Sequence, residues 1–217
     1  MKVPKYLAPT EWVQPNNYPD LRQADEIAID LETRDPNLKS LGSGAIIGNG
    51  EIVGIAVAVE GWSGYFPIAH GEGPNMDRVK TLSWFKDILE SPATKIFHNA
   101  MYDVCWIRAL GYKINGLIVD TMIACSLIDE NRYSYTLNTL SWNFLNKGKN
   151  ETLLVQAAKE RGLDPKADMW KLPAMEVGAY AEKDAELTLE LWNKVSKILV
   201  EDNLEDIFNL ETDLFLV

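Results

Sequence analysis

The sequence predicts an α/β domain in which a mixed sheet carries helices on both faces. Short, apolar, β-branched runs near the N-terminus are joined by turn-rich links, and this is typical of an antiparallel meander. From residue 76 onward, amphipathic helical segments alternate with further strands. The chain has 217 residues, of which 47% are hydrophobic. This is enough for one domain with a substantial core.

Each element follows from its local pattern. Short apolar runs predict strands, and they cover residues 26–32, 51–59, 64–68, 95–98 and 116–119. The links at 48–50 and 61–64 contain glycines and connect the first three strands. Apolar residues at helical spacing predict helices over 76–90, 100–110, 121–129, 137–145, 151–161 and 175–200.

Two carboxylates lie at the end of the first strand. Because side chains i and i+2 of a strand point to the same face, Asp30 and Glu32 project side by side. Ile29 and Leu31 then face the opposite way. Adjacent carboxylates repel each other unless a cation neutralises them or one is protonated. Hard cations such as Mg²⁺ prefer oxygen ligands, so the pair indicates a metal site, although a solvated strand end has the same pattern.

Two further acidic positions follow on helices. Asp103 lies within the segment His-Asn-Ala-Met-Tyr-Asp, and Asp184 comes four residues after Tyr180. At this spacing a phenol and a carboxylate share one helix face and address the same small volume. Four acids from three separate segments are what a two-metal phosphodiesterase needs. Taken singly, these residues also fit half-buried packing and a solvated helix face.

From about Trp12 onward, the chain resembles the proofreading 3′→5′ exonuclease domain of family A DNA polymerases, particularly the phage members. This family belongs to the DEDD exonuclease superfamily, in the branch with tyrosine in the last motif. The three motifs are matched by residues 30–33, 98–103 and 180–184. The similarity also includes residues 64–70, 120–124, 137–140 and 148–149. All four acids and the tyrosine are present.

The resemblance implies a ribonuclease H-like fold and a 3′→5′ exodeoxyribonuclease that uses two divalent ions, Mg²⁺ or Mn²⁺. It implies that Asp30 contacts both ions, that Glu32 and Asp184 complete the tighter site, and that Asp103 supports the second. Tyr180 is expected to orient the attacking water, because a phenol with a pKa of about 10 stays protonated at neutral pH. The expected substrate is a DNA 3′ end, preferably single-stranded or mismatched, since a paired end must first fray.

Several neighbouring residues have lesser expected roles. The motif positions of Thr33 and Asn99 suggest that they bind the terminal nucleotide, although local capping and turn bonds explain them almost as well. We expect His98 to be a structural histidine and Asp120 to be a helix N-cap. The irregular region 131–172 is expected to cover the mouth of the site. Its lysines are interpreted as ordinary surface residues rather than phosphate contacts: Lys147, Lys149, Lys166 and Lys171.

The expected organisation has three parts. Residues 1–20 are rich in Pro and Asn and are predicted to form an extended N-terminal arm. Residues 21–200 are predicted to form the exonuclease domain. Residues 201–217 are predicted to start a helical connection to a polymerase domain of the same parent chain. No apolar run approaches membrane-spanning length, and the expected location is the cytoplasm of a bacterial or phage-infected host cell.

The net charge of −11 argues against a protein that tracks long duplex DNA, because such proteins carry a basic stripe. An enzyme that trims ends holds only a few nucleotides, and bound metal ions add positive charge at the phosphate. Two alternatives stay open: a ribonuclease D-like exoribonuclease, and a non-catalytic nucleic-acid-binding or scaffold domain of the same fold. The extended match over 116–184 favours the polymerase branch, and the presence of all four acids argues against a scaffold.

Overall fold

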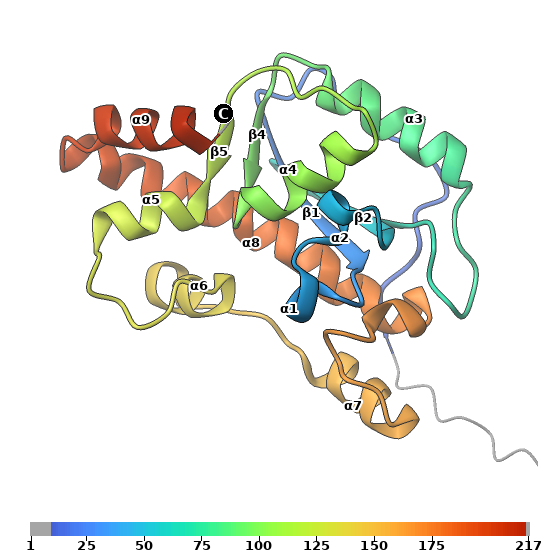
Figure 1. The fold of residues 1–217 in the computed structure, drawn as a ribbon. Coiled ribbons are helices and arrows are strands. Elements are labelled where there is room, and N and C mark those ends of the chain that lie inside the picture. The colour runs from blue at the N-terminus through green and yellow to red at the C-terminus, as the bar shows by residue number, and fades with distance from the viewer. Residues whose placement is uncertain (1–9, 216–217) are drawn as a thin grey trace, which may run out of the picture.

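The computed structural model describes residues 10–215, and within them five strands form one mixed sheet with the order β3-β2-β1-β4-β5 (Figure 1). Strand β1 (Glu26–Arg34) pairs antiparallel with β2 (Glu51–Val59), and β2 pairs antiparallel with β3 (Trp62–Pro67). Strand β4 (Thr94–Phe97) runs parallel to β1, and β5 (Ile118–Asp120) runs parallel to β4. The predicted mixed sheet, with an antiparallel meander followed by strands that alternate with helices, is confirmed.

The long helices lie where the apolar periodicity predicts them. They are α3 (Arg78–Leu89), α4 (Ala100–Ala109), α5 (Thr121–Ile128), α6 (Leu137–Leu145), α7 (Thr152–Arg161), α8 (Ala174–Glu201) and α9 (Glu205–Phe215). Three short helices are not predicted by the sequence: α1 (Leu38–Leu41), α2 (Gly44–Ile47) and the 3-10 helix η1 (Met169–Lys171). Elements of three or four residues are too short to show a helical period.

The predicted extent of one turn is wrong. The link predicted at 61–64 is shorter, because β3 already begins at Trp62 and pairs there with Val59. Gly61 alone has the left-handed backbone of this turn, with φ of 74°. A tight hairpin of this kind needs only two residues between its strands, so the second glycine of the link, Gly64, is free to lie within β3.

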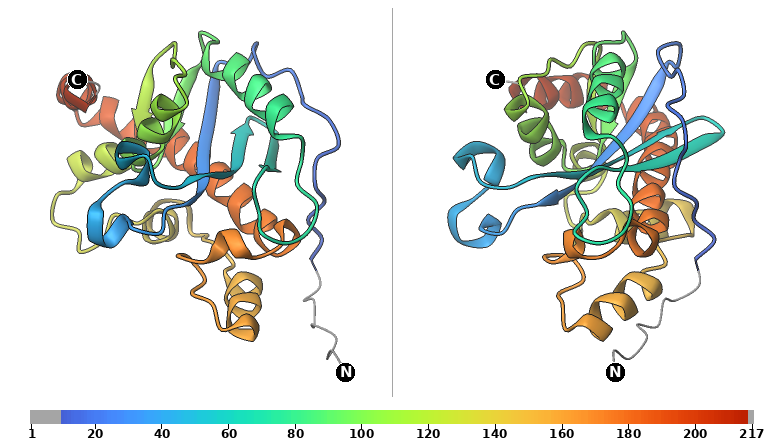
Figure 2. Two further views of the ribbon diagram at one scale, coloured as in Figure 1. Left: turned by 45° about the vertical axis from the view of Figure 1, so that its right-hand side comes forward. Right: turned by 90° about the vertical axis from the view of Figure 1, so that its right-hand side faces the viewer.

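Helices cover both faces of the sheet, as predicted (Figure 2). On one face, α3 and α4 pack against large β1 side chains that include Ile27, Ile29 and Leu31. On the other face, α8 lies against β1, β2 and β3, and it also contacts α5, α6 and α7. Alternation along β1 therefore directs its even-numbered residues toward α8.

The face beneath α8 is lined by small residues. Ala28, Ala56 and Ala58 are fully buried there, in the same apolar cluster as Ala181 and Ala185 of α8. Small side chains on both surfaces let a helix approach a sheet closely. The polar positions of β1 that follow Ala28 therefore lie close to the α8 backbone.

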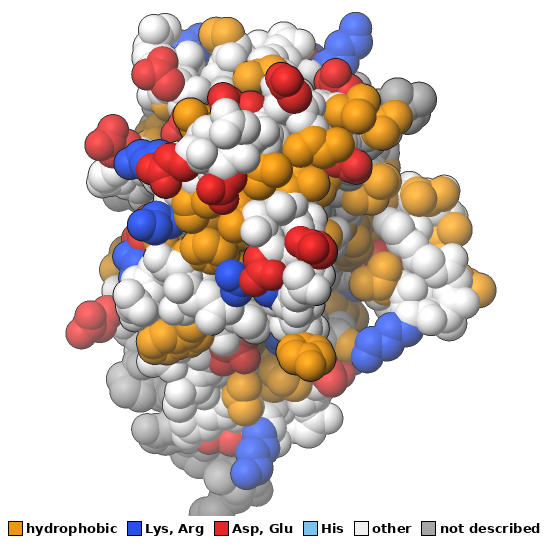
Figure 3. All heavy atoms as spheres, turned by 90° about the vertical axis from the view of Figure 1, so that its left-hand side faces the viewer, with side chains coloured by type: hydrophobic (Ala, Val, Ile, Leu, Met, Phe, Trp, Pro, Cys, Tyr) orange, Lys and Arg blue, Asp and Glu red, His pale blue; other side chains and the backbone are white. Residues whose placement is uncertain are grey.

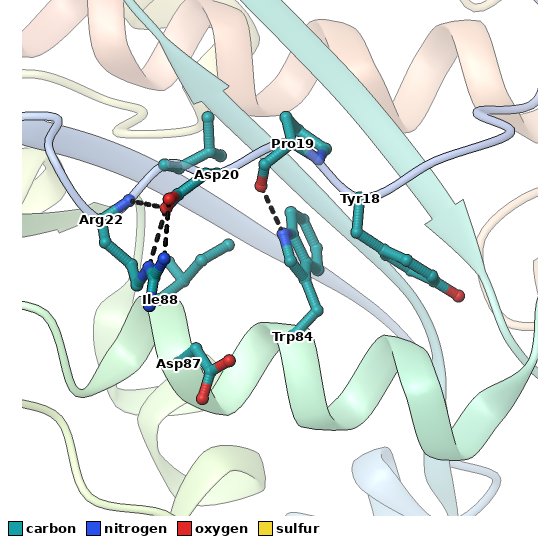
Figure 4. A pocket seen from close by; sticks show the side chains of 8 residues that line it. Tyr18, Pro19, Asp20, Arg22, Trp84, Asp87 and Ile88 are labelled. Carbon is teal, nitrogen blue, oxygen red and sulfur yellow. Dashed lines mark hydrogen bonds and ion pairs between the residues drawn. The ribbon is translucent and has the colours of Figure 1, made fainter.

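Residues 10–20 contain no helix or strand, and they pack along the domain. Trp12 is 7% exposed, and its indole Nε1 donates to Glu182 Oε2 of α8 at 3.0 Å. A Cβ on Gly178 would lie 2.2 Å from this indole, so a glycine is needed beneath it. Figure 4 shows the same segment crossing α3, where Trp84 Nε1 donates to the carbonyl oxygen of Pro19 at 2.7 Å. Residues 1–9 of the expected arm lie outside the described residues.

Helix α9 lies beside α5 near the C-terminal end of the structure (Figure 1). Its Phe208 is buried, whereas Ile207, Leu210 and Leu214 are exposed. Figure 3 shows apolar side chains gathered on this side of the molecule, between acidic and basic ones. Residues 216 and 217, at the end of the predicted helical connection, lie outside the described residues.

Replacing Trp12 by Ala is expected to lower the free energy of unfolding by about 3–5 kcal/mol, because it removes a buried aromatic side chain and leaves a cavity on α8. Urea unfolding followed by circular dichroism measures this. The control is Tyr133→Ala, which truncates a fully exposed aromatic and should change stability by less than about 0.5 kcal/mol. Equal effects of the two changes would mean that Trp12 does not contribute to the core.

Candidate active site

Three of the predicted acids converge between β1 and α8. One carboxylate oxygen each from Asp30, Glu32 and Asp184 lies within 4.8 Å of the other two. Asp30 and Glu32 point toward α8 because Ile29 and Leu31 occupy the opposite core. Asp184 meets them because α8 packs against β1. We call this group the carboxylate cluster.

Two more side chains touch the carboxylate cluster at Asp184. Tyr180 lies one turn earlier on α8, and Lys149 comes from the segment between α6 and α7. The ammonium Nζ of Lys149 lies 2.5 Å from Asp184 Oδ2 and 3.3 Å from the Tyr180 hydroxyl. The same ammonium lies 4.8 Å from the centre of the Tyr180 ring, which is within the range of a cation–π contact.

The interpretation of Lys149 as an ordinary surface lysine is wrong, because its side chain is only 10% exposed. The other three lysines of the region are more exposed and pair with acids away from the cluster: Lys147 with Glu190, Lys166 with Glu151, and Lys171 with Asp168. For these three the surface interpretation is confirmed. No periodic pattern marks Lys149, because it lies in an irregular segment.

Asp103 is not part of the carboxylate cluster. It is 4% exposed on α4, and one of its carboxylate oxygens accepts the backbone N–H of Leu31 at 3.0 Å. Burial raises its pKa, and the charge of Asp30 raises it further. Asp103 is therefore close enough to Asp30 for their charges to interact, while its hydrogen bond ties α4 to the middle of β1.

A pocket of 430 Å³ opens onto Asp30 and Asp184, a volume in the range of about 300–1,000 Å³ that small-ligand pockets occupy. Its apolar lining comes from Met122, Tyr135 and Leu137, at the starts of α5 and α6. Its remaining lining residues are His98, Asn99, Thr136 and Lys149. Residues of the irregular region thus border the site, as expected.

The two predicted nucleotide-binding residues lie in different surroundings. Asn99 is exposed, lines the pocket and has left-handed backbone with φ of 65°. Asp120 holds this turn, because its carboxylate accepts the N–H groups of Asn99 at 3.0 Å and Ala100 at 2.8 Å. Thr33 is absent from the pocket lining, and its hydroxyl lies 2.6 Å from the Tyr102 hydroxyl.

The structural roles expected for His98 and Asp120 are confirmed. His98 Nδ1 lies 2.8 Å from the Thr121 hydroxyl, and Nε2 lies 2.9 Å from the carbonyl oxygen of Tyr135, to which it donates. Burial lowers the pKa of His98 to about 4, so the ring is neutral. Asp120 caps α5 by accepting the N–H of Met122.

The electrostatics of the cluster favour a bound cation. Burial and the charge of Asp30 together raise the pKa of Asp184 to about 7, against the opposing effect of Lys149. Burial also raises the pKa of Glu32, together with the charges of Asp30 and Asp184. Burial raises the pKa of Asp30, and Lys149 opposes this shift. A single ammonium therefore does not neutralise three carboxylates.

The donor set fits a hard divalent ion. The cluster offers carboxylate oxygens from three residues, which suit Mg²⁺ and Mn²⁺. Asp184 Oδ2 is bound by Lys149, whereas Asp184 Oδ1 is buried and has no hydrogen-bond partner within residues 10–215. A buried oxygen without a partner costs free energy unless a ligand satisfies it, so Asp184 Oδ1 is the strongest single sign of a cation site.

Comparison with known proteins agrees with this geometry. Residues 16–200 match the family model described as 3′-5′ exonuclease. The chain belongs to this exonuclease family. It is 36% identical over 219 residues to a DNA-directed DNA polymerase of Pseudomonas phage M6, covering 94% of this chain and 32% of that protein. It is 26% identical to DNA polymerase DpoZ of Salmonella phage PMBT28, covering 91% of this chain and 30% of that protein. This exonuclease thus spans about a third of the length of these relatives.

Solved structures agree with the ribonuclease H-like fold of this exonuclease. Brucella melitensis NrnC superposes with a TM-score of 0.63 at 19% identity, covering 90% of this chain and 84% of that one. The catalytic core of RRP6 from Trypanosoma brucei superposes with a TM-score of 0.61 at 21% identity, covering 90% and 46%. The predicted resemblance and fold class are both confirmed.

The raised carboxyl pKa values predict a pH-dependent stability. Because the pKa of Asp184 is about 7 in the folded protein and about 3.9 in an unfolded chain, the folded state binds this proton more tightly. Without metal, stability should therefore fall as pH rises from 5 to 8. Mg²⁺ should restore it most strongly at pH 8, where the carboxylates are ionised.

Thermal unfolding in EDTA and in Mg²⁺ measures this effect. The matched control is Asp184→Asn, in which residue 184 cannot titrate. Both proteins contain the same histidines, which change stability with pH in the opposite direction. The difference in Tm between the two proteins therefore removes the contribution of the histidines. Wild type should lose several degrees of Tm relative to this variant between pH 5 and pH 8 in EDTA. If Tm changed with pH by the same amount in the two proteins, the raised pKa of Asp184 would be contradicted.

Proposed function

We propose that this exonuclease removes nucleotides from DNA 3′ ends with the help of divalent metal ions, as the proofreading domain of a DNA polymerase. The observation that carries the proposal is the convergence of Asp30, Glu32 and Asp184 beside Tyr180 at an open pocket. Both phage relatives named above are DNA polymerases, and this supports DNA as the substrate.

Asp30, Glu32 and Asp184 are the residues that would hold the metal, with Asp103 in a supporting position next to β1. Two ions, Mg²⁺ or Mn²⁺, would supply an activated water and stabilise the charge on the leaving 3′ oxygen. NrnC, which shares the fold, has been solved with bound Mg²⁺. The buried Asp184 Oδ1 supports the same proposal, since none of the described residues forms a hydrogen bond with it.

Tyr180 is proposed to orient the attacking water. Burial raises the pKa of its hydroxyl, and the neighbouring charges of Asp184 and Glu32 raise it further. The phenol therefore stays protonated and acts through hydrogen bonds rather than as a base. Its position one turn from Asp184 keeps this hydroxyl beside the carboxylate cluster.

The terminal nucleotide is proposed to enter the pocket between α4, α5 and α6. Asn99 supports this, because its side chain is exposed in a rigid turn at the pocket wall. Met122, Tyr135 and Leu137 provide an apolar surface for a base. Thr33 is the weaker of the two expected contacts, because its hydroxyl is already bonded to Tyr102.

An exoribonuclease of the ribonuclease D type is the second candidate. The observation in its favour is the structural similarity to NrnC and RRP6, of which NrnC has been solved bound to pGG. Discrimination between RNA and DNA depends on recognition of the 2′-hydroxyl. The carboxylate cluster is compatible with both substrates, so the substrate has to be tested directly.

The proposed partner is a polymerase domain of the same parent chain. Helix α9 has three exposed apolar residues, Ile207, Leu210 and Leu214. They support a surface at this end of the domain that the polymerase domain covers. Among the described residues, no helix is both long and apolar enough to cross a membrane. A cytoplasmic site of action is proposed from the phage and bacterial polymerases that the chain resembles.

Digestion of 5′-labelled single-stranded DNA tests the proposal. We expect a ladder that shortens from the 3′ end in Mg²⁺ or Mn²⁺ and disappears in EDTA. Asp184→Asn should lower the rate by at least about 10²-fold, because it removes a proposed metal ligand. The control Asp206→Asn removes an exposed acid on α9 and should leave the rate unchanged. Faster digestion of a matched RNA would favour the exoribonuclease, and no digestion by a folded wild type would overturn both.

A duplex with a mismatched 3′ end should be digested faster than a fully paired one. The paired end must first unstack at about 1–2 kcal/mol per base-pair step, so the ratio should approach an order of magnitude. Rates on two hairpins that differ only in the terminal pair measure this. Equal rates would contradict a proofreading role while leaving exonuclease activity itself intact.

A further inference from the structure

Lys149 is held in place by contacts of its segment with α6. Its backbone N–H donates to Asn138 Oδ1 of α6 at 2.9 Å. The preceding residue is Gly148, where a Cβ would lie 2.2 Å from Trp142 Nε1 and 2.5 Å from Asn138 Oδ1. A side chain at position 148 would therefore have to displace the side chains of Trp142 and Asn138. These two contacts direct a lysine from an irregular segment into a largely buried position.

The ammonium of Lys149 makes a bridge between two groups of the site. An ammonium only donates hydrogen bonds, and this one reaches Asp184 Oδ2 at 2.5 Å and the Tyr180 oxygen at 3.3 Å. It also lies 4.8 Å from the centre of the Tyr180 ring. Lys149 thus contacts Tyr180 at both its hydroxyl and its ring, so it restrains the ring position and the direction of the hydroxyl.

We propose that Lys149 is a positioning residue for Tyr180 in the exonuclease reaction. It acts by fixing the phenol relative to Asp184 rather than by touching the metal or the DNA. This inference rests on the proposed function, in which Tyr180 orients the attacking water. A loosely held phenol would misplace that water, and a misplacement of about 1 Å can cost about 10²-fold in rate.

A double-mutant cycle tests the coupling between the two residues. The proteins are wild type, Lys149→Met, Tyr180→Phe and the double variant, assayed on single-stranded DNA at saturating Mg²⁺. Lys149→Met should lower kcat by about 10–100-fold with KM within about 3-fold. In the Tyr180→Phe background the same change should lower kcat by less than about 3-fold, because the hydroxyl that Lys149 holds is already gone. Lys149→Arg should restore part of the rate.

Lys147→Met is the matched control. It removes the same charge two residues away, from a side chain that is 46% exposed and pairs with Glu190. Its kcat should stay within about 2-fold of wild type, since exposed pairs contribute little. Mn²⁺ binding by calorimetry gives a readout besides activity. Lys149→Met should bind Mn²⁺ within about 3-fold of wild type, whereas Asp184→Asn should bind it much more weakly.

Three results would overturn the inference. Independent, multiplicative effects in the cycle would mean that Lys149 does not act through Tyr180. A rise in KM at unchanged kcat would make it a substrate contact, and weakened Mn²⁺ binding would make it a support of the metal site. Circular dichroism confirms folding. If Lys149→Met does not fold, Asn138→Ala replaces it in the double-mutant cycle. This variant removes the hydrogen bond to the Lys149 backbone N–H and keeps the charge of Lys149.

Failure of this inference is distinguishable from failure of the proposed function. A wild type that shows no metal-dependent digestion would remove both. An active wild type, abolished by Asp184→Asn but unaffected by Lys149→Met, would remove only the role of Lys149.

Discussion

The close packing of α8 on the sheet is the constraint on which the rest of the structure depends. Alanines on β1 and β2 share one buried cluster with alanines on α8, so small side chains lie where the helix meets these two strands. Where the alanines end on β1, the inward positions are Asp30 and Glu32, and α8 places Asp184 opposite them. The same packing that stabilises the core therefore assembles three carboxylates. Larger residues at the alanine positions would move Asp184 away from β1 and separate the cluster.

Burying three carboxylates side by side is electrostatically unfavourable, and two features of the site bear on this cost. Burial raises the pKa values of all three carboxyl groups, and the charges of neighbouring carboxylates raise those of Glu32 and Asp184 further, which disfavours the ionised forms. Lys149 neutralises part of this charge from within the chain, at Asp184 Oδ2. In the described part of the chain, Asp184 Oδ1 has no hydrogen-bond partner, and this leaves a position at which a divalent ion would lower the free energy of the folded state. The resident lysine and the proposed metal thus address different oxygens of one carboxylate.

Much of this arrangement could be predicted from the sequence because it follows from short-range periodicity. The period of two along β1 placed Asp30 and Glu32 on one face, and the i, i+4 spacing on α8 placed Tyr180 beside Asp184. The position of Lys149 could not be predicted in this way, because it depends on a tertiary hydrogen bond to Asn138 and on the fit of Gly148 against Trp142. The surroundings of Thr33 could not be predicted either, because its hydroxyl lies beside the Tyr102 hydroxyl of α4. Its substrate contact stays a prediction.

A crystal structure with Mn²⁺, located by its anomalous scattering, tests the central claim most directly. The account predicts an anomalous peak in contact with Asp30, Glu32 and Asp184, with Asp184 Oδ1 as a ligand and Lys149 still bonded to Oδ2. A protein soaked in Mn²⁺ that shows no peak at these carboxylates, or a peak held by other residues, would contradict it.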